Sequence, residues 1–357
     1  MRYSLFVPLF LTSTLVSAFP GPHLLERHEP RTNTATHCST PAVRKEWRDL
    51  DRTTQQGYIS AVKCLATKPA RVNNNTGATL YDDFATVHMR LGEEIHFVAQ
   101  FFPWHRWFVH LYETALKECG YVGSATYWDW TKDAGPNVPN SPVFDPVTGF
   151  GGTGTNITTR SPIATGPFVN FTVMAYAENW PQSGDGLYYN RPHYLERNLG
   201  SVIDRNDTVV VVPASEDGSM LSDRYSETMM NSIMTNGKDF ESFRGPFEGI
   251  PHAALHDAIG GDMGPTSSPN DPLFFLHHTN VDRWWWKWQH LKNSANALQY
   301  TGNTVRGASE LNATAADMMP FLGLMGGNDL PVSDVLLTNT SILCYTYDWV
   351  PFRKKNS

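Results

Sequence analysis

Histidines gather in two stretches of the chain, and their spacing in each stretch suits metal binding. In the second stretch, His252 and His256 lie four residues apart, so on a helix they share one face and can hold one ion between them. His277 and His278 are adjacent and point about 100° apart on a helix, so we expect only one of them to reach the same ion. Asp282, four residues after His278, is placed to accept a ring N–H, and this favours His278 as the ligand.

The first stretch contains His88, His96 and His105. Residues nine apart on one uninterrupted helix point about 180° away from each other, so His96 and His105 can converge only if the chain turns between them. Pro103 provides a reason for that turn, because proline interrupts an α-helix. Three neutral imidazoles per ion, without a thiolate or a required carboxylate, suit copper or zinc better than magnesium or calcium. Two such triplets in one chain predict a paired metal centre.

The segments that carry these histidines have mostly helical patterns. Apolar residues at three- and four-residue spacing predict helices at 41–50 and 53–66, and a further helical pattern at 81–119. Gly92 and Pro103 divide the third pattern into shorter pieces. Helical patterns return later in the chain, with expected starts at Asp239, Pro251 and Pro272.

The middle of the chain has a different composition. Residues 133–225 are rich in glycine, proline, serine, asparagine and threonine, which predicts long loops, with a short strand near 208–212. A last strand is expected at 341–350. The sequence therefore predicts a mainly α domain with long loops and a few short β strands.

Composition and charge exclude several classes of protein. Hydrophobic residues make up 41% of the 357 residues and charged residues 18%, which is typical of a folded globular protein. The net charge of −7 argues against a nucleic-acid-binding protein, which usually presents a basic face. Beyond the N-terminus no run of apolar residues is long enough to cross a membrane. We therefore expect no nucleic-acid partner and no membrane span, and a monomer or small oligomer.

The N-terminus has the three parts of a secretory signal peptide, namely Arg2, a short apolar stretch and the small residues Val16-Ser17-Ala18. We predict a signal peptide at 1–18, followed by a flexible segment at 19–37, and a secreted protein. Asn-x-Ser/Thr sites fit passage through the secretory route and predict N-glycosylation. They lie at Asn74, Asn156, Asn170, Asn206, Asn312 and Asn339.

Four cysteines in an exported protein favour two disulfides over a metal site, and no Cys-x-x-Cys pair is present. Three pairings are possible. We favour Cys64 with Cys119, because each lies at the end of a predicted helix, and Cys38 with Cys344, which would tie the two ends of the domain together.

The two histidine stretches resemble the signatures of the tyrosinase, catechol oxidase and hemocyanin group, the dinuclear type 3 copper proteins. The first signature is His96 followed by FFPWHR at 101–106, and the second is DPLFFLHHTNVD at 271–282. The likeness extends from about Cys38 to the Tyr-Thr-Tyr at 345–347. It implies a dicopper domain at 38–350, followed by a tail at 351–357, in a short secreted fungal-type form.

The resemblance also implies a four-helix bundle around the two metals and assigns their ligands. One copper ion would be bound by His88, His96 and His105, and the other by His252, His256 and His278. Proteins of this group use the two copper ions and dioxygen to oxidise phenols or catechols to o-quinones. The implied partners are therefore a small phenolic substrate and dioxygen.

Departures from the family pattern concern the surroundings of the ligands. Some members link a cysteine to the second histidine of the first site, but Glu94 stands two residues before His96, so that thioether is not expected. Glu248 resembles the glutamate said to hold a catalytic water near the second copper. The asparagine that usually partners this glutamate is replaced by Ala253, and Asp257 follows His256.

Three functions share this set of ligands. The first is a polyphenol oxidase acting on o-diphenols and on some monophenols, in secondary metabolism or pigment formation. The second is a redox-neutral dizinc enzyme that rearranges a secondary metabolite, as in hemocyanin-like proteins of the cyclopenase type. The third is an oxygen carrier, which a small exported domain suits poorly because cooperative carriage needs assembled sites. We favour the oxidase.

Overall fold

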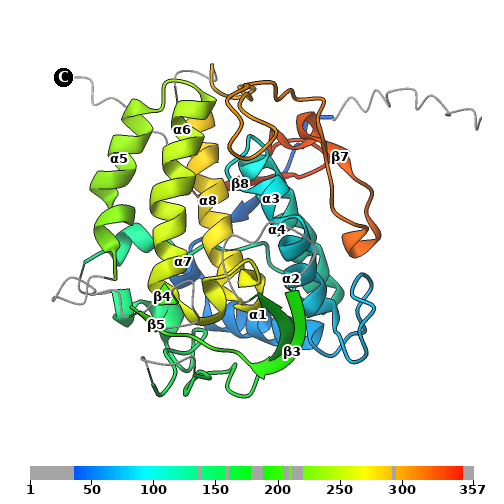
Figure 1. Cartoon of the computed structure of the whole chain (residues 1–357), viewed down its shortest axis with the longest axis vertical. Coiled ribbons are helices and arrows are strands. Elements are labelled where there is room, and N and C mark those ends of the chain that lie inside the picture. The colour runs from blue at the N-terminus through cyan, green and yellow to red at the C-terminus, as the bar shows by residue number, and fades with distance from the viewer. Residues whose placement is uncertain are drawn as a thin grey trace, which may run out of the picture. The chain divides into compact units, whose positions relative to one another are not determined.

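The computed structural model describes residues 36–135, 138–156, 161–177, 188–200, 202–203, 209–210, 220–291 and 295–348. The predicted signal peptide, the rest of the N-terminal segment up to residue 35 and the tail at 351–357 lie outside the described residues. The described helices, labelled in Figure 1, are α1 (Arg52–Leu65), α2 (Leu80–Arg90), α3 (Gly92–Ile95), α4 (Phe101–Glu118), α5 (Glu227–Asn236), α6 (Phe240–Phe247), α7 (Ala253–Ile259) and α8 (Leu273–Gln289).

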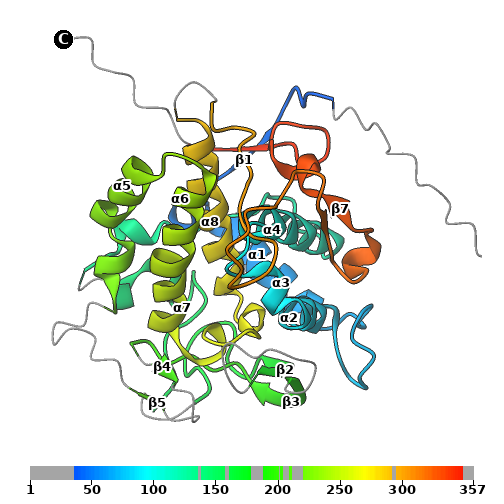
Figure 2. The same cartoon turned by 45° about the horizontal axis from the view of Figure 1, so that its top comes forward.

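Helix α8 lies between α6 and α4, as both Figure 1 and Figure 2 show. Each of its residues is buried, including the charged Asp282 and Arg283, which form ion pairs with Arg106 and Asp129. The ring of Trp285 stacks on Phe102 of α4 with centroids 5.4 Å apart, and Trp288 stacks on Phe243 of α6 at 5.0 Å. These contacts place helices from three distant parts of the chain around one core, and the predicted mainly α fold is confirmed.

Local signals start several of these helices. The Thr79 side chain caps α2 and exchanges hydrogen bonds with Asp82, forming a capping box, and Asp239 and Ser242 do the same for α6. Pro272 immediately precedes α8, as predicted from its fixed φ. The predicted helix at 53–66 is confirmed as α1, which begins one residue earlier after the cap Asp51. Helix α5 was not predicted.

The predicted helix at 41–50 is wrong. This segment contains strand β1 (Ala42–Arg44) and a single 3₁₀ turn at Trp47–Asp49. Strand β1 pairs in parallel with β8 (Tyr345–Tyr347) from the predicted C-terminal strand region. The pairing joins residues about 300 positions apart, so a partner at the far end of the chain outweighs the helical spacing of the local sequence.

The remaining strands form short two-stranded sheets. β2 (Thr172–Ala177) pairs with β3 (Tyr188–Tyr194), β4 (Val202–Ile203) with β5 (Val209–Val210), and β6 (Met318–Met319) with β7 (Leu330–Pro331), all antiparallel. Val209–Val210 lies within the strand predicted at 208–212. No described helix is long and apolar enough to cross a membrane.

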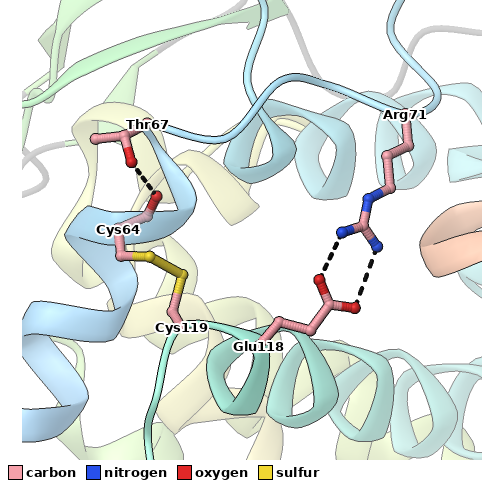
Figure 3. The surroundings of a disulfide bond; sticks show 5 residues. All are labelled: Cys64, Thr67, Arg71, Glu118 and Cys119. Atoms are coloured by element: carbon pink, nitrogen blue, oxygen red, sulfur yellow. Dashed lines mark hydrogen bonds and ion pairs between the residues drawn. A yellow bond between two sulfur atoms is a disulfide. The ribbon is translucent and has the colours of Figure 1, made fainter.

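Both predicted disulfides are confirmed. Cys64 at the end of α1 is bonded to Cys119 after α4, with Cα atoms 5.9 Å apart, and Cys38 is bonded to Cys344 at 5.5 Å. All four cysteines of the chain are therefore used, and none remains for a thioether to His96. Figure 3 shows that the Cys64–Cys119 bond lies close to an ion pair in which the Arg71 guanidinium binds both carboxylate oxygens of Glu118.

A buried cluster of charges joins both ends of the domain to the bundle. The Asp282 carboxylate on α8 accepts hydrogen bonds from Arg106 on α4, Arg44 on β1, and the hydroxyls of Tyr345 and Tyr347 on β8. Buried charges are stable only when they are paired and fully hydrogen-bonded, and this carboxylate has four donors. The cluster therefore specifies where β1 and β8 lie against α4 and α8.

The disulfide and the neighbouring ion pair should differ strongly in their contributions to stability. The double variant Cys64→Ser/Cys119→Ser opens a loop of 55 residues and should lower the free energy of unfolding by about 4 kcal/mol. Arg71→Met removes an ion pair whose side chains are 40% and 38% exposed, and should cost about 0–1 kcal/mol because water screens exposed charges. Chemical denaturation measures both values. Equal losses would contradict this account.

Glu113 should make the domain resistant to acid. Burial alone would raise the pKa of Glu113, but Arg44 and Lys117 outweigh it and lower the pKa to about 2. A lowered pKa contributes stability that is present above the unfolded value of about 4.5 and is lost as pH falls toward 2, here about 3 kcal/mol. Glu113→Gln should lower the free energy of unfolding at neutral pH and flatten its dependence on pH between these limits. An unchanged slope would refute the assignment.

Candidate metal centre

The first histidine cluster forms where three helices meet. His88 is near the end of α2, His96 follows α3, and His105 is in the first half of α4. One ring nitrogen from each lies within 4.8 Å of the others, and the three side chains are almost fully buried. The structure therefore brings together the three histidines that the sequence placed in one site.

The chain turns between His96 and His105, as predicted, but Pro103 does not make the turn. His96 is extended and Phe97 adopts a positive φ of 58°, so the direction changes before α4 begins at Phe101. Pro103 is the third residue of α4, where a backbone N–H has no partner within the helix in any case. Its position explains why this proline does not interrupt the helix that carries His105.

The second cluster contains His252, His256, His277 and His278, again with ring nitrogens within 4.8 Å of one another. The expectation that Pro251 starts a helix is wrong. Residues Glu248–His252 form a π turn that joins α6 directly to α7, and the Ala253 N–H donates to the Glu248 carbonyl across it. This wider turn accommodates Pro251 within a continuous helical segment and places His252 one turn before His256.

The predicted contact between Asp282 and His278 is wrong. The Asp282 carboxylate instead accepts hydrogen bonds from Arg106, Arg44, Tyr345 and Tyr347. Nδ1 of His278 has no hydrogen-bond partner. The spacing of four residues brought the two side chains to one side of α8. Donors from distant segments then bound the carboxylate, because a buried guanidinium satisfies a buried charge better than a neutral imidazole does.

Backbone carbonyls orient five of the six predicted ligands. His96, His105 and His252 donate from Nδ1 to the carbonyls of Gly92, Phe101 and Glu248, each four residues earlier, at 2.9, 2.7 and 3.1 Å. His88 and His256 donate to Thr266 and Met263, both at 2.7 Å. A carbonyl can only accept, so Nδ1 carries the proton and Nε2 keeps its lone pair. This is the usual arrangement of a metal-binding histidine.

The spacing of the Nε2 atoms fits metal ions. In the first cluster Nε2 of His88 and His105 are 3.4 Å apart, and in the second Nε2 of His256 and His278 are also 3.4 Å apart. In the first pair both atoms carry lone pairs, so no proton joins them and only a cation would make the approach favourable. Two ligands at about 2.0–2.1 Å from a tetrahedral ion lie about 3.3 Å apart. The residues present therefore fit one ion per cluster.

Burial keeps these imidazoles neutral. It lowers the pKa of His88 to about 3 and of His256 to about 4, and it lowers the pKa of His96, His105, His252 and His278 well below the ordinary value, with further repulsion from neighbouring histidines. Neutral imidazole is the form that binds metal, so no proton has to leave when an ion enters at neutral pH.

The two clusters face each other. The rings of His105 and His278, one from each cluster, stack with centroids 4.4 Å apart. Phe274 packs against both clusters, 4.1 Å from His278 and 5.1 Å from His88, and Phe101 packs between His105 and His252. These rings surround the nitrogens with apolar side chains, so two ions bound here would occupy one shared, water-poor centre.

Glu248 and Ala253 lie on either side of His252. The Glu248 carboxylate is fully buried and accepts from Arg244 at 2.6 Å and from the Phe97 backbone N–H at 2.5 Å. Burial raises the pKa of Glu248 to about 7, although Arg244 opposes the shift. Ala253 is the first residue of α7, half-buried, and its methyl group offers no hydrogen bond.

Sequence reasoning did not identify several residues of this site. The carbonyls of Met263 and Thr266 reach their histidines through tertiary contacts, and no sequence pattern indicates them. Arg244 was detectable, because it stands four residues before Glu248, the spacing of a helical ion pair. Phe274 was part of the second signature but had no assigned role.

Comparison with known proteins agrees with this geometry. Residues 78–291 match the family model for the common central domain of tyrosinase. The chain is 38% identical to a tyrosinase-like protein of Diaporthe leptostromiformis over 328 residues, which cover 89% of this chain and 80% of that protein. The chain belongs to the tyrosinase family.

Further tyrosinase relatives support the assignment. A tyrosinase of Aspergillus flavus is 32% identical, with 96% of this chain and 90% of that protein covered. A polyphenol oxidase variant from Thermothelomyces thermophila has the same fold, with a TM-score of 0.71 at 28% identity, covering 87% of this chain and 90% of that one. Family membership supports an oxidoreductase with a dinuclear metal centre, and enzymes of the tyrosinase family act on small phenols with dioxygen.

His278 and His277 provide a direct test of the ligand set. His277 is also buried, both its ring nitrogens lack hydrogen-bond partners, and it belongs to the same group of four. We expect His278→Ala to lower bound metal from about two ions to about one per chain and to abolish activity, because two imidazoles hold an ion weakly. His277→Ala should keep both ions. Elemental analysis of the two purified variants measures the bound metal per chain. Equal losses of metal in the two variants would overturn the assignment of His278 as the ligand.

Proposed function

We propose that this chain is a type 3 copper polyphenol oxidase that converts o-diphenols to o-quinones with dioxygen. The observation that carries the proposal is the pair of neutral histidine triplets facing each other across the stacked rings of His105 and His278. His88, His96 and His105 would hold one ion, and His252, His256 and His278 the other. A closely spaced pair of sites suits a reaction in which one molecule of dioxygen takes electrons from two substrates.

The reaction consumes two o-diphenols and one dioxygen and yields two o-quinones and two waters. When bound, the copper pair would supply the binding of dioxygen and the passage of electrons to it. The protein supplies the rest. Carbonyl hydrogen bonds hold five imidazoles in position, burial keeps all six neutral, and Phe101 and Phe274 limit water around them.

Monophenols should be poorer substrates than catechols. A phenol has a pKa near 10, so at neutral pH its proton must be taken by a base before it can bind a metal as phenolate. The family resemblance points to a water held between a glutamate and an asparagine for this task. Here Glu248 accepts hydrogen bonds from Arg244 and Phe97 and can still hold a water with its remaining lone pairs, but Ala253 has no amide to orient that water.

We therefore expect initial rates on a monophenol to be about a hundredfold below those on the matching catechol, at the low end of what a positioned base contributes. Ala253→Asn should raise the monophenol rate and leave the catechol rate nearly unchanged. Ala253→Leu is the matched control, because leucine has the size of asparagine without its amide. Comparable wild-type rates on the two substrates would contradict the prediction.

Metal analysis separates the oxidase from the redox-neutral alternative. Neutral imidazole triplets accept zinc as readily as copper, so the donor set alone favours neither ion. Copper-loaded protein that oxidises catechol while consuming one dioxygen for two quinones supports the proposal. A protein that purifies with zinc and, once copper-loaded, turns over neither phenol would overturn it in favour of a dizinc enzyme.

We also propose that the protein is exported and N-glycosylated. Two disulfides support an oxidising compartment. The asparagines at the described glycosylation sites are all exposed, as an enzyme that attaches glycans requires; they are Asn74, Asn156, Asn170, Asn312 and Asn339. Asn206 and the signal peptide at 1–18 lie outside the described residues.

A further inference from the structure

One loop supplies a carbonyl to each of the two histidine clusters. It joins α7 to α8, and its Met263 carbonyl accepts from Nδ1 of His256 while its Thr266 carbonyl accepts from Nδ1 of His88. Three other ligands receive their carbonyls from within their own local helical turns. The ring orientation of His256 and His88, and therefore the aim of their Nε2 atoms, depends on where this loop lies.

Asp262 fastens this loop to the β2–β3 hairpin region. Its side chain is fully buried, with one carboxylate oxygen 2.9 Å from Nε2 of His193 and the other accepting the Glu196 N–H at 2.8 Å. The Asp262 N–H in turn donates to the Glu196 carbonyl at 3.0 Å. Side chain and backbone of one residue therefore bind the same short segment, immediately before Met263.

The neighbouring glycine permits this close approach. Gly261 has a positive φ of 55°, and a Cβ atom there would lie 2.3 Å from the Glu196 carbonyl oxygen. Any side chain at 261 would push the loop away from residues 196–197 and move Met263 with it. The backbone conformation and the lack of a side chain at Gly261 therefore allow the loop to lie directly against residues 196–197.

We propose that Asp262 is a positioning residue for both metal sites: by binding His193 and Glu196, it holds the loop at the place where Met263 and Thr266 orient one ligand of each cluster. The proposal rests on the metal ligands of the proposed function, but not on its substrate or its redox chemistry. Asp262 acts on the ligands through the two carbonyls of the loop.

The same three side chains admit a second explanation. One donor atom each from His193, Glu196 and Asp262 lies within 4.8 Å of the others, the spacing of a small ion site. The contacts favour an ion pair. His193 donates from Nδ1 to the Arg191 carbonyl, so a second proton on Nε2 would bind the Asp262 carboxylate directly. Burial disfavours the positive charge that this second proton gives His193. The hydrogen bond to Asp262 and the negative charge of Asp262 nevertheless raise the pKa of His193 above its ordinary value.

The test measures metal release rather than turnover. Protein loaded with zinc is mixed with excess chelator, and the rate and number of ions released are followed. Asp262→Leu keeps the size of the side chain but removes its hydrogen bonds, and should speed release of both ions by about 10–100-fold, the effect usual for residues that orient ligands. Asp262→Asn can still accept from Glu196 and donate to neutral His193, and should release zinc at nearly the wild-type rate.

Asp133→Asn is the matched control for general loss of stability. Asp133 is also buried and accepts three hydrogen bonds, from Arg48, Trp128 and Ser141, but it contacts neither the loop nor a ligand. It should lower the melting temperature without changing zinc release. If Asp133→Asn speeds release as much as Asp262→Leu does, the effect is general destabilisation and the proposal fails.

Two further outcomes would overturn the proposal. Wild-type release rates in folded Asp262→Leu would show that the loop needs no such anchor. Loss of a third zinc equivalent in His193→Leu would show that Asp262 is an ion ligand. Should Asp262→Leu not fold, His193→Leu replaces it, since His193 is partly exposed, and a severalfold faster release of two ions is the expected result. Because zinc supports no phenol oxidation, failure of the oxidase assignment would leave these measurements unaffected.

Discussion

The metal centre depends on one buried ion pair, between Arg106 and Asp282. Arg106 directly follows the predicted ligand His105 on α4, and Asp282 lies one helical turn after the predicted ligand His278 on α8. Because both charges are fully buried, separating them would leave two unpaired charges in the core, which costs several kcal/mol. The pair therefore specifies the register of the two helices. That register lets the rings of His105 and His278 stack at 4.4 Å, where the two metal sites meet.

The same burial that makes the ion pair necessary prepares the histidines. An imidazole removed from water disfavours its charged form, and every predicted ligand is at most 8% exposed. With Nδ1 hydrogen-bonded to carbonyls, Nε2 of five predicted ligands keeps the lone pair that binds a metal ion. Where two such lone pairs face each other, as in His88 and His105 at 3.4 Å, a cation between them would turn an unfavourable contact into a favourable one. The folded protein therefore already holds the imidazoles neutral and oriented, and this increases its affinity for a metal ion.

Glu248 connects the surroundings of the second cluster to the first. Glu248 is engaged by Arg244 and by the backbone of Phe97, so it ties the turn after His96 to the helix that carries His252. This carboxylate is therefore a structural link between the two clusters.

Much of this site could be predicted from the sequence. The helix at 53–66 and the start of α8 at Pro272 follow from local spacing and composition, which act over a few residues. The two triplets follow from spacing together with the family signatures, and counting cysteines predicted two disulfides but left three pairings possible. Predictions from local patterns were wrong where a segment far away in the chain supplied the interaction partner. Residues 42–44 became a strand because β8 pairs with them, and Asp282 bound Arg106 instead of His278. The carbonyls of Met263 and Thr266 belong to the same class, since any residue has a carbonyl and only the folded chain decides which one meets a histidine. Side-chain identity and spacing thus determined which atoms can bind metal, and tertiary packing decided how they are aimed, because orientation arises from contacts between segments far apart in the chain.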